Sequence, residues 1–296
     1  MNTALQELAE LGTLKYFNEV PENIGYSSSM FMMFGLPPTR LKGNPAFWTK
    51  NNGLYEITLA RHPDHEIPYG CLARAVQIFI DTEVRTKNTN VIDAGRCYHD
   101  FARKLGYKDG KTNKELVKQL LNYVNCTIHL KIVKTTAKNT QLTLDNTLVS
   151  EHSDLFFDIP HPNQMTMSSG KIYLSEKYAR HLHDHTVPLD MNVVRCFRRN
   201  PLALDFYRYM AYRTFDLNKE LSFPDHFLFE QLGVGHKHDR LTRQRLNTIL
   251  RAIKNDWPGL KADFKDGYFV LNPSGLAVPA RPASHSRLII THNTGG

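Results

Sequence analysis

The order of the predicted elements constrains the fold of this chain most, because the same order occurs twice. Each half contains helical patterns with apolar residues at helical spacing, followed by two short stretches separated by a polar tip. Gly106 and Gly233 end corresponding helices, as glycine often does at a helix C-terminus. A winged helix has this order, with helices followed by a β-hairpin. Two copies of the order in tandem are stronger evidence for that fold than one copy would be. The sequence therefore predicts an α+β fold with two tandem winged-helix domains, mainly helical with small antiparallel β-hairpin wings.

The predicted elements follow from apolar spacing and from turn residues. Asn200 and Pro201 read as an N-cap followed by proline at the first helical position. The sequence Lys265-Asp266-Gly267 is a tight hairpin signal. Helices are predicted at residues 71–84, 96–105, 112–124, 193–197, 201–214, 224–232 and 241–255, and hairpin strands at residues 126–133, 141–148, 260–264 and 268–271.

The domain limits follow from this order. The stretch 187–215 is predicted to begin the second unit and to pack against the first. The short stretch 23–29 reads as a loop. The predicted division is an N-terminal segment at 1–30, a first winged-helix domain at 31–150, a connection at 151–170, a second winged-helix domain at 171–272 and a mobile tail at 273–296. Within the N-terminal segment, Leu5, Leu8 and Leu11 lie on one side of a predicted amphipathic helix.

Charge and cysteine content narrow the class of protein. The 296 residues carry a formal charge of +8, spread over both halves, which favours an anionic partner such as nucleic acid. The four cysteines form no CxxC pair and are expected to be free thiols in a reducing cytosol. The first residues carry acids rather than a basic signal-peptide region, and no apolar run approaches the roughly 18 residues of a membrane span. We therefore expect a cytoplasmic protein with no membrane partner.

The predicted helix at 241–255 is the strongest candidate for reading DNA. Leucine and isoleucine side chains form its inward stripe, and the polar residues lie clear of that stripe. They are Arg240, Arg243, Gln244, Asn247, Arg251 and Lys254. Arginine can make paired hydrogen bonds to guanine, and asparagine or glutamine to adenine. We expect Arg243 and Asn247, one turn apart, to point outward together and read neighbouring base pairs. The alternative is an ordinary solvated helix face.

The corresponding helix of the first unit carries lysines instead. Its outward residues are predicted to be Lys111, Lys114, Lys118 and Asn122, and the wing tips add Lys134, Lys138, Lys261 and Lys265. Lysine suits phosphate better than bases, so we expect Lys118 to hold the DNA backbone. Each of these lysines has the alternative of being an ordinary exposed side chain.

Two signals resemble enzyme motifs. His181-Leu182-His183 has the form of an HUH-type metal-dependent nicking endonuclease, with tyrosines downstream as conceivable nucleophiles. That chemistry needs both histidines on a strand, where alternate side chains face one metal, but the pair ends a helical pattern. The glycine-rich stretch 106–112 has three residues between its glycines, whereas a phosphate-binding loop needs four. We therefore expect no catalytic residues, no metal site and no cofactor.

Several motifs together resemble one family. They are NGLY at 52–55, IPYGCLAR at 67–74, DTEVRTK at 81–87, VPLD at 187–190, NPLALDFY at 200–207 and YR at 212–213. This set is similar to the signature of plasmid-encoded RepA replication initiators, over about residues 30–275. The combination is specific, whereas any one tetrapeptide is weak.

The resemblance implies a non-enzymatic initiator. Such a protein binds repeated double-stranded sites at a plasmid origin, helps to open an adjacent AT-rich segment, and recruits the host initiator and replicative helicase. The family also implies repression of its own promoter as a homodimer. Two alternatives stay open: the nicking endonuclease of rolling-circle replication, and a plain winged-helix repressor.

Overall fold

The computed structural model describes residues 23–52, 55–95, 97–107, 110–135, 140–155, 170–234, 239–278 and 288–291, and for a few residues in these ranges only the backbone. The helices are α3 (Ser29–Phe34), α4 (Gly70–Lys87), α5 (Tyr98–Lys104), α6 (Gly110–Val124), α7 (Glu176–Asp184), α8 (Met191–Cys196), α9 (Pro201–Phe215), α10 (Asp225–Leu232) and α11 (Asp239–Asp256). The strands are β1 (Ile24–Ser28), β2 (Phe47–Asn51), β3 (Tyr55–Ala60), β4 (Val91–Asp93), β5 (Thr127–Thr135), β6 (Thr140–Leu148), β7 (Ser150–Asp154), β8 (Lys171–Leu174), β9 (Thr186–Asp190), β10 (Leu221–Pro224), β11 (Ala262–Lys265) and β12 (Tyr268–Leu271).

The predicted helices and hairpins are confirmed to within a few residues. The Ala203 backbone N–H donates to the Asn200 side chain, which caps α9 with Pro201 in its first turn. Gly233 ends α10 with a left-handed φ of 69°. The fold is a mixture of helices and small antiparallel sheets, as predicted. Its assignment to two winged helices stays a prediction.

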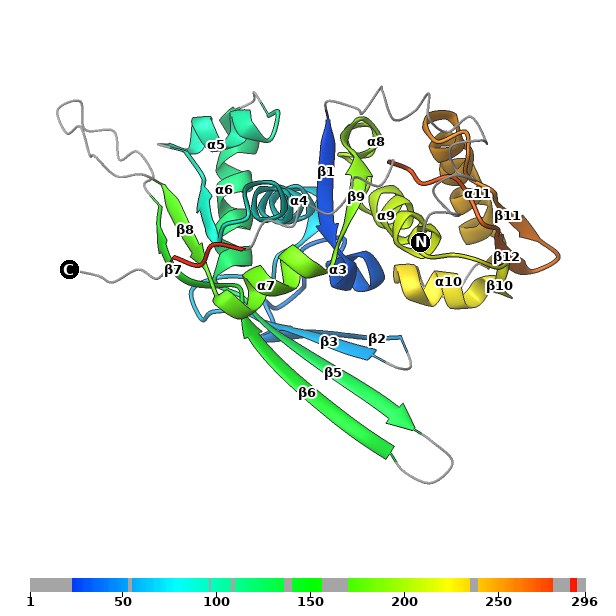
Figure 1. The fold of residues 1–296 in the computed structure, drawn as a ribbon, viewed down its shortest axis with the longest axis horizontal. Helices are drawn as coiled ribbons and strands as arrows, with labels where there is room; N and C mark the ends of the chain where they lie inside the picture. The colour runs from blue at the N-terminus through cyan, green and yellow to red at the C-terminus, as the bar shows by residue number, and fades with distance from the viewer. Residues whose placement is uncertain are drawn as a thin grey trace, which may run out of the picture.

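The two hairpins belong to larger sheets than the sequence indicates. The β5–β6 hairpin joins β2 and β3 in a four-stranded sheet of order β2-β3-β5-β6, and it projects from the body of the molecule (Figure 1). The β11–β12 hairpin gains β10 as a third strand, in the order β10-β12-β11. Each sheet packs one face on a hydrophobic core.

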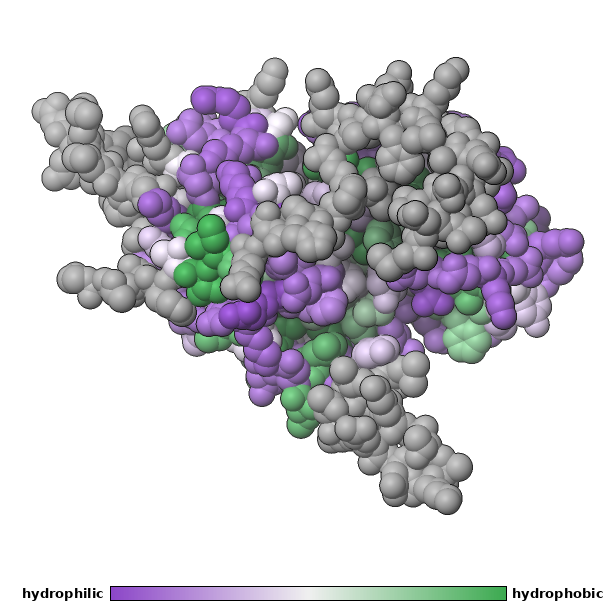
Figure 2. Space-filling view, viewed as in Figure 1, coloured by the Kyte–Doolittle hydropathy of each residue, from purple (hydrophilic) through white to green (hydrophobic). Residues whose placement is uncertain are grey.

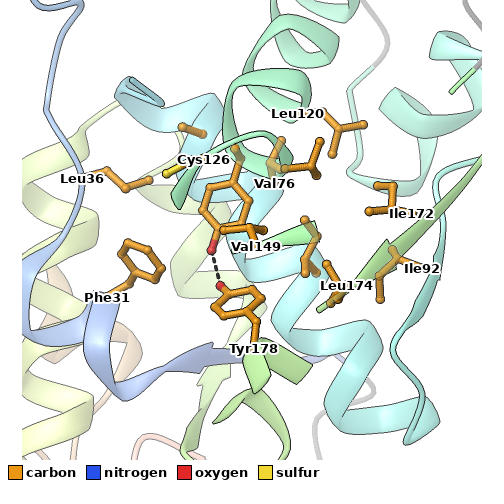
Figure 3. Packing of buried hydrophobic residues seen from close by; sticks show 14 of the residues in the cluster. Phe31, Leu36, Val76, Ile92, Leu120, Cys126, Val149, Ile172, Leu174 and Tyr178 are labelled. Carbon is orange, nitrogen blue, oxygen red and sulfur yellow. Dashed lines mark hydrogen bonds between the residues drawn. The ribbon is translucent and has the colours of Figure 1, made fainter. Parts of the chain in front are cut away.

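The first core lies between α3, α4, α6, α7 and the sheets beside them. Val76 of α4, Leu120 of α6 and Ile172 of β8 contribute side chains to it (Figure 3). The hydroxyl groups of Tyr123 and Tyr178 share a hydrogen bond of 2.5 Å within this apolar surrounding. Burial raises the pKa of each of the two tyrosines well above the ordinary value of tyrosine, so both hydroxyl groups stay neutral and each is the hydrogen-bond partner of the other.

The second core is formed by α8 to α11 and the β10–β12 sheet. Phe206 on α9 and Phe269 on β12 are fully buried, with ring centroids 5.7 Å apart. From Val187 of β9 onward, the buried apolar residues up to Leu271 belong to the second core, which also receives Met32 of α3 and Ile78 of α4. The domain limits drawn from the sequence stay predictions.

The interpretation of residues 23–29 as a loop is wrong. Ile24–Ser28 form β1, which pairs antiparallel with β9, and the Ser29 backbone N–H donates to the His185 carbonyl. This strand lies between α4 and α8–α9 (Figure 1). The pairing joins segments about 160 residues apart in the chain, which local sequence patterns do not reveal.

The tail prediction concerns mostly residues outside the described ranges. Its described parts, residues 273–278 and 288–291, are packed on the body of the molecule rather than mobile: Val278 is buried, the Trp257 indole N–H donates to the Gly275 carbonyl, and Leu288 and Ile290 pack on the first core. The Ile289 backbone N–H donates to the Asn88 carbonyl at 2.8 Å, and the Asn90 side chain bonds both backbone groups of Thr291. The predicted helix near Leu8 also falls outside the described residues.

Candidate nucleic-acid interface

The exposed ridge of α11 carries arginine and amide side chains. Arg240, Gln244 and Arg251 are exposed and fall on one side of the helix, because they are four and seven residues apart. The opposite side is buried in the second core through Leu246 and Ile253. Arg245 is also exposed, on the next flank. It is not among the residues predicted to contact DNA, although it too lies clear of the apolar stripe.

The expectation that Arg243 and Asn247 point outward together is met only in part, because their flank of α11 is half-buried and Arg243 has an acidic partner. Both lie on the flank of α11 next to buried Leu250, and Asn247 is half-buried. Arg243 donates to the Asp225 carboxylate at the start of α10, and Asp225 is buried. The guanidinium of Arg243 therefore has an internal partner. Lys254 lies on the same flank and is likewise half-buried.

The β11–β12 hairpin presents charge at its end. Lys261 and Lys265 are exposed, and Asp266 turns the chain with a left-handed φ of 50°. Hydrophilic residues gather over this end of the molecule (Figure 2). Tyr268 adjoins the turn with 48% of its surface exposed. An aromatic ring beside lysines on a protruding hairpin can contact a nucleic-acid backbone and its sugars.

On the corresponding surface of the first unit, fewer of the described side chains are free to contact DNA than predicted. Lys114 is exposed on α6, but Lys118 is half-buried and its Nζ lies 3.2 Å from the Glu66 carboxylate. Burial raises the pKa of Glu66, but hydrogen bonds from Arg40 and Lys118 outweigh it, so its pKa lies below its ordinary value. Lys118 therefore already has an anionic partner.

Asn122 was expected to face outward, and this is wrong. It is 2% exposed, and the Glu66 backbone N–H donates to its Oδ1 at 3.1 Å. Gln119 satisfies the Tyr69 backbone N–H in the same way, at 3.0 Å. The loop before α4 covers this flank of α6, because its backbone donors need acceptors once they are buried. The Lys111 and Lys134 side chains and all of Lys138 lie outside what the structure describes.

The paired histidines lie on α7, a helix. His181 and His183 are two residues apart, so their side chains point to different sides of the helix axis. The His181 ring nitrogen Nε2 lies 3.0 Å from the Ser28 hydroxyl, whereas Nδ1 of His183 lies 2.8 Å from the Asp184 carboxylate. Across the described part of the chain, no group of three histidine, cysteine or acidic side chains is arranged to hold a metal ion.

The pKa of His181 makes a testable contribution to stability. Burial lowers this pKa from 6.5 to about 4. Between these values the unfolded chain binds more protons than the folded one, so stability is lost as pH falls from about 6.5 towards 4, by up to about 1.4 kcal/mol per pH unit. Urea unfolding at pH 7, 6 and 5 should show a smaller loss in His181→Asn than in wild type. The difference between the two proteins cancels the pH-dependent contributions of other groups such as Asp81. Burial raises the pKa of Asp81 to about 7. Equal losses in both proteins would contradict the assignment to His181.

One protein family matches this chain. A family model described as plasmid encoded RepA protein matches residues 67–225. No curated protein matches. Two solved structures of domains 2 and 3 of RctB are similar at 10% and 11% identity, with TM-scores of 0.49 and 0.48. They cover 85% and 83% of this chain, and 97% and 96% of those chains.

Fold and surface define a mixed α+β protein with two cores, small antiparallel sheets and an exposed basic helix face. The chain belongs to the family of plasmid-encoded RepA proteins, because the family model matches more than half of it. The matched residues include α4 to α9 and so span the contact between the two cores. This membership supports a role in the initiation of plasmid replication. In the described residues, no helix is both long enough and apolar enough to span a membrane.

Proposed function

We propose that this protein initiates plasmid replication by binding repeated double-stranded sites at the origin. Binding opens an adjacent AT-rich segment and recruits the host initiator and the replicative helicase. A homodimer of the protein represses its own promoter. The protein itself is not an enzyme and needs no cofactor. Membership of the RepA family supports the role in initiation, and the α11 surface supports direct contact with DNA.

The observation that carries the DNA-binding part is the α11 ridge. Arg240 and Arg251 are exposed without a carboxylate partner among the described side chains, and Gln244 lies between them. A helix that presents arginine and glutamine on one exposed side has the groups that read guanine and adenine edges in the major groove. Lys261 and Lys265 on the neighbouring hairpin add positive charge for the phosphates.

Base reading and backbone holding can be separated by substitution. Gln244→Ala is expected to weaken binding to the specific site by about 1–3 kcal/mol and to leave binding to a scrambled duplex nearly unchanged. Lys265→Ala should weaken both equally, because phosphate contacts carry little sequence information. Asn218→Ala, which removes an exposed amide beyond the end of α9, is the matched control and should change neither.

The probes are labelled duplexes from the plasmid DNA around the gene, in which nuclease footprinting identifies the bound repeats. Competition with scrambled duplexes then gives both affinities. If Gln244→Ala lowers both affinities by the same factor, α11 does not read the sequence. Specificity would then reside in the first unit or in the hairpins.

The non-enzymatic part has its own test. His181→Ala combined with His183→Ala is expected to leave DNA binding and plasmid maintenance nearly intact, because the two side chains diverge on α7. Supercoiled origin DNA incubated with wild type and Mg²⁺ or Mn²⁺ should stay unnicked. A metal-dependent nick that disappears in the double variant would establish the nicking endonuclease instead.

A further inference from the structure

A groove separates the α4–α5 side of the first core from α8 and α9 of the second. It encloses about 560 Å³, and its floor is apolar, with Ile78 of α4, Val194 of α8 and Leu204 of α9 among the residues that line it. Ile78 and Leu204 are almost fully buried at its base, and partly exposed Phe79 and Met191 supply apolar surface that a ligand can cover. An apolar floor of this kind suits the apolar side of an amphipathic helix.

The rims of the groove are basic. Arg195 and Arg198 line it from α8 and the turn that follows, and Arg199 lines a second hollow that shares Arg198. Arg198 and Arg199 are exposed and have no acidic partner among the side chains that the structure describes. On the opposite rim Lys104 pairs with Asp93 at 3.0 Å and Arg103 with Asp100 at 3.2 Å, so the uncompensated charge lies on the α8 side.

The first described residues form part of the same groove. Asn23, Ile24 and Gly25 line it, and β1 begins at the edge of the molecule where α5 and α8 lie (Figure 1). Residues 1–22 of the chain therefore attach at the groove itself. This segment has four acids and one lysine, a net charge of −3, in a chain whose total is +8. The acids are Glu7, Glu10, Glu19 and Glu22, against Lys15.

We propose that the N-terminal segment, residues 1–22, is the ligand of this groove within the same chain. Leu5, Leu8 and Leu11 of the predicted amphipathic helix lie on the apolar floor, and the acidic residues face Arg198 and Arg199. Residues 12–22 can extend to roughly 36 Å, which is ample for a segment attached at the groove. Attachment also raises its effective concentration to about the millimolar range, so it outcompetes a separate acidic partner of similar intrinsic affinity.

Hydrogen exchange of the full-length protein, read by mass spectrometry, tests the docking. In wild type the amides of residues 4–11 should exchange slowly. Leu5→Ser with Leu8→Ser should lose about tenfold of this protection, which corresponds to about 1.4 kcal/mol. Gln6→Ser is the matched control, because it makes the same kind of change on the polar side of the predicted helix, and it should keep the protection.

A charge exchange identifies the site of docking. Arg198→Glu with Arg199→Glu, and separately Glu7→Arg with Glu10→Arg, should each reduce the protection of residues 4–11. The fourfold combination should restore it. Thermal unfolding of each variant shows that the fold is kept, since these arginines are exposed.

Two results would overturn the proposal. The first is that residues 4–11 are unprotected in wild type, or are protected equally in all of the groove variants. The second is protection that increases with protein concentration, which would place the segment on a second copy of the chain. Recovery of protection in the fourfold variant, independent of concentration, establishes docking within one chain.

Discussion

Replacing Asp205 by asparagine is expected to lower the free energy of unfolding by about 3–5 kcal/mol. Asp205 on α9 accepts two hydrogen bonds from Arg74 on α4, at 2.8 Å from Nε and 2.5 Å from Nη2. Arg208, one turn further along α9, lies 3.5 Å from the same carboxylate. Both guanidinium groups are fully buried, so removal of the carboxylate charge leaves two positive charges in the interior without their anion.

The surrounding groups replace this anion only in part. The Asp81 carboxyl interacts with Arg208, but burial raises the pKa of Asp81 to about 7, so at neutral pH it is only partly ionised. The remaining Arg74 hydrogens are donated to the Gly70, Leu36 and Pro37 carbonyls, which carry no net charge. Arg208 donates to the Ser27 hydroxyl at 2.6 Å and to the Gln77 side chain, and its Nε finds no acceptor. Because α4 belongs to the first core and α9 to the second, the loss should loosen the contact between them.

Urea unfolding at pH 7 measures the effect. Asp145→Asn is the matched control, since the Lys177–Asp145 ion pair is exposed and such pairs contribute about 0–1 kcal/mol. A lower midpoint with an unchanged denaturant slope is expected for Asp205→Asn. A loss no larger than that of the control would show that the buried guanidinium groups are stabilised by other means.

DNA affinity is expected to fall about a thousandfold or more between 50 and 200 mM salt. This expectation rests on the proposed DNA binding and on six exposed basic residues that could each displace a counterion from phosphate. They are Lys114, Arg240, Arg245, Arg251, Lys261 and Lys265. Six such contacts correspond to a slope of about −5 in log affinity against log salt concentration.

Titrations of a labelled duplex at four salt concentrations give this slope. Lys265→Ala should make the slope less steep by about one phosphate contact. Asp216→Asn is the control: it removes the charge of an exposed acidic residue beyond α9 and should not make the slope less steep. A slope near zero would mean that the basic faces of α6, α11 and the hairpin are only solvated. DNA binding would then have to depend on other surfaces.

Local patterns in the sequence determined most of the elements. The apolar stripe Leu246, Ile249 and Ile253 repeats at helical spacing, so α11 forms where it was predicted. Asn200 and Pro201 start α9, and Gly233 ends α10, because these residues favour the backbone conformations at those positions. The family resemblance was also contained in the sequence, in motifs that lie mainly on α4, β9 and α9.

Which side chains face solvent was decided only by the tertiary structure. Asn122 and Arg243 lie on the polar flanks of their helices, and sequence spacing alone leaves such flanks open to water. A loop with unsatisfied backbone donors covers Asn122, and α10 brings Asp225 to Arg243. The pairing of β1 with β9, and the burial of Arg74 and Arg208 around Asp205, also depend on residues far apart in the chain. Helical and strand periodicity describes one element at a time, whereas burial depends on which other element packs against it.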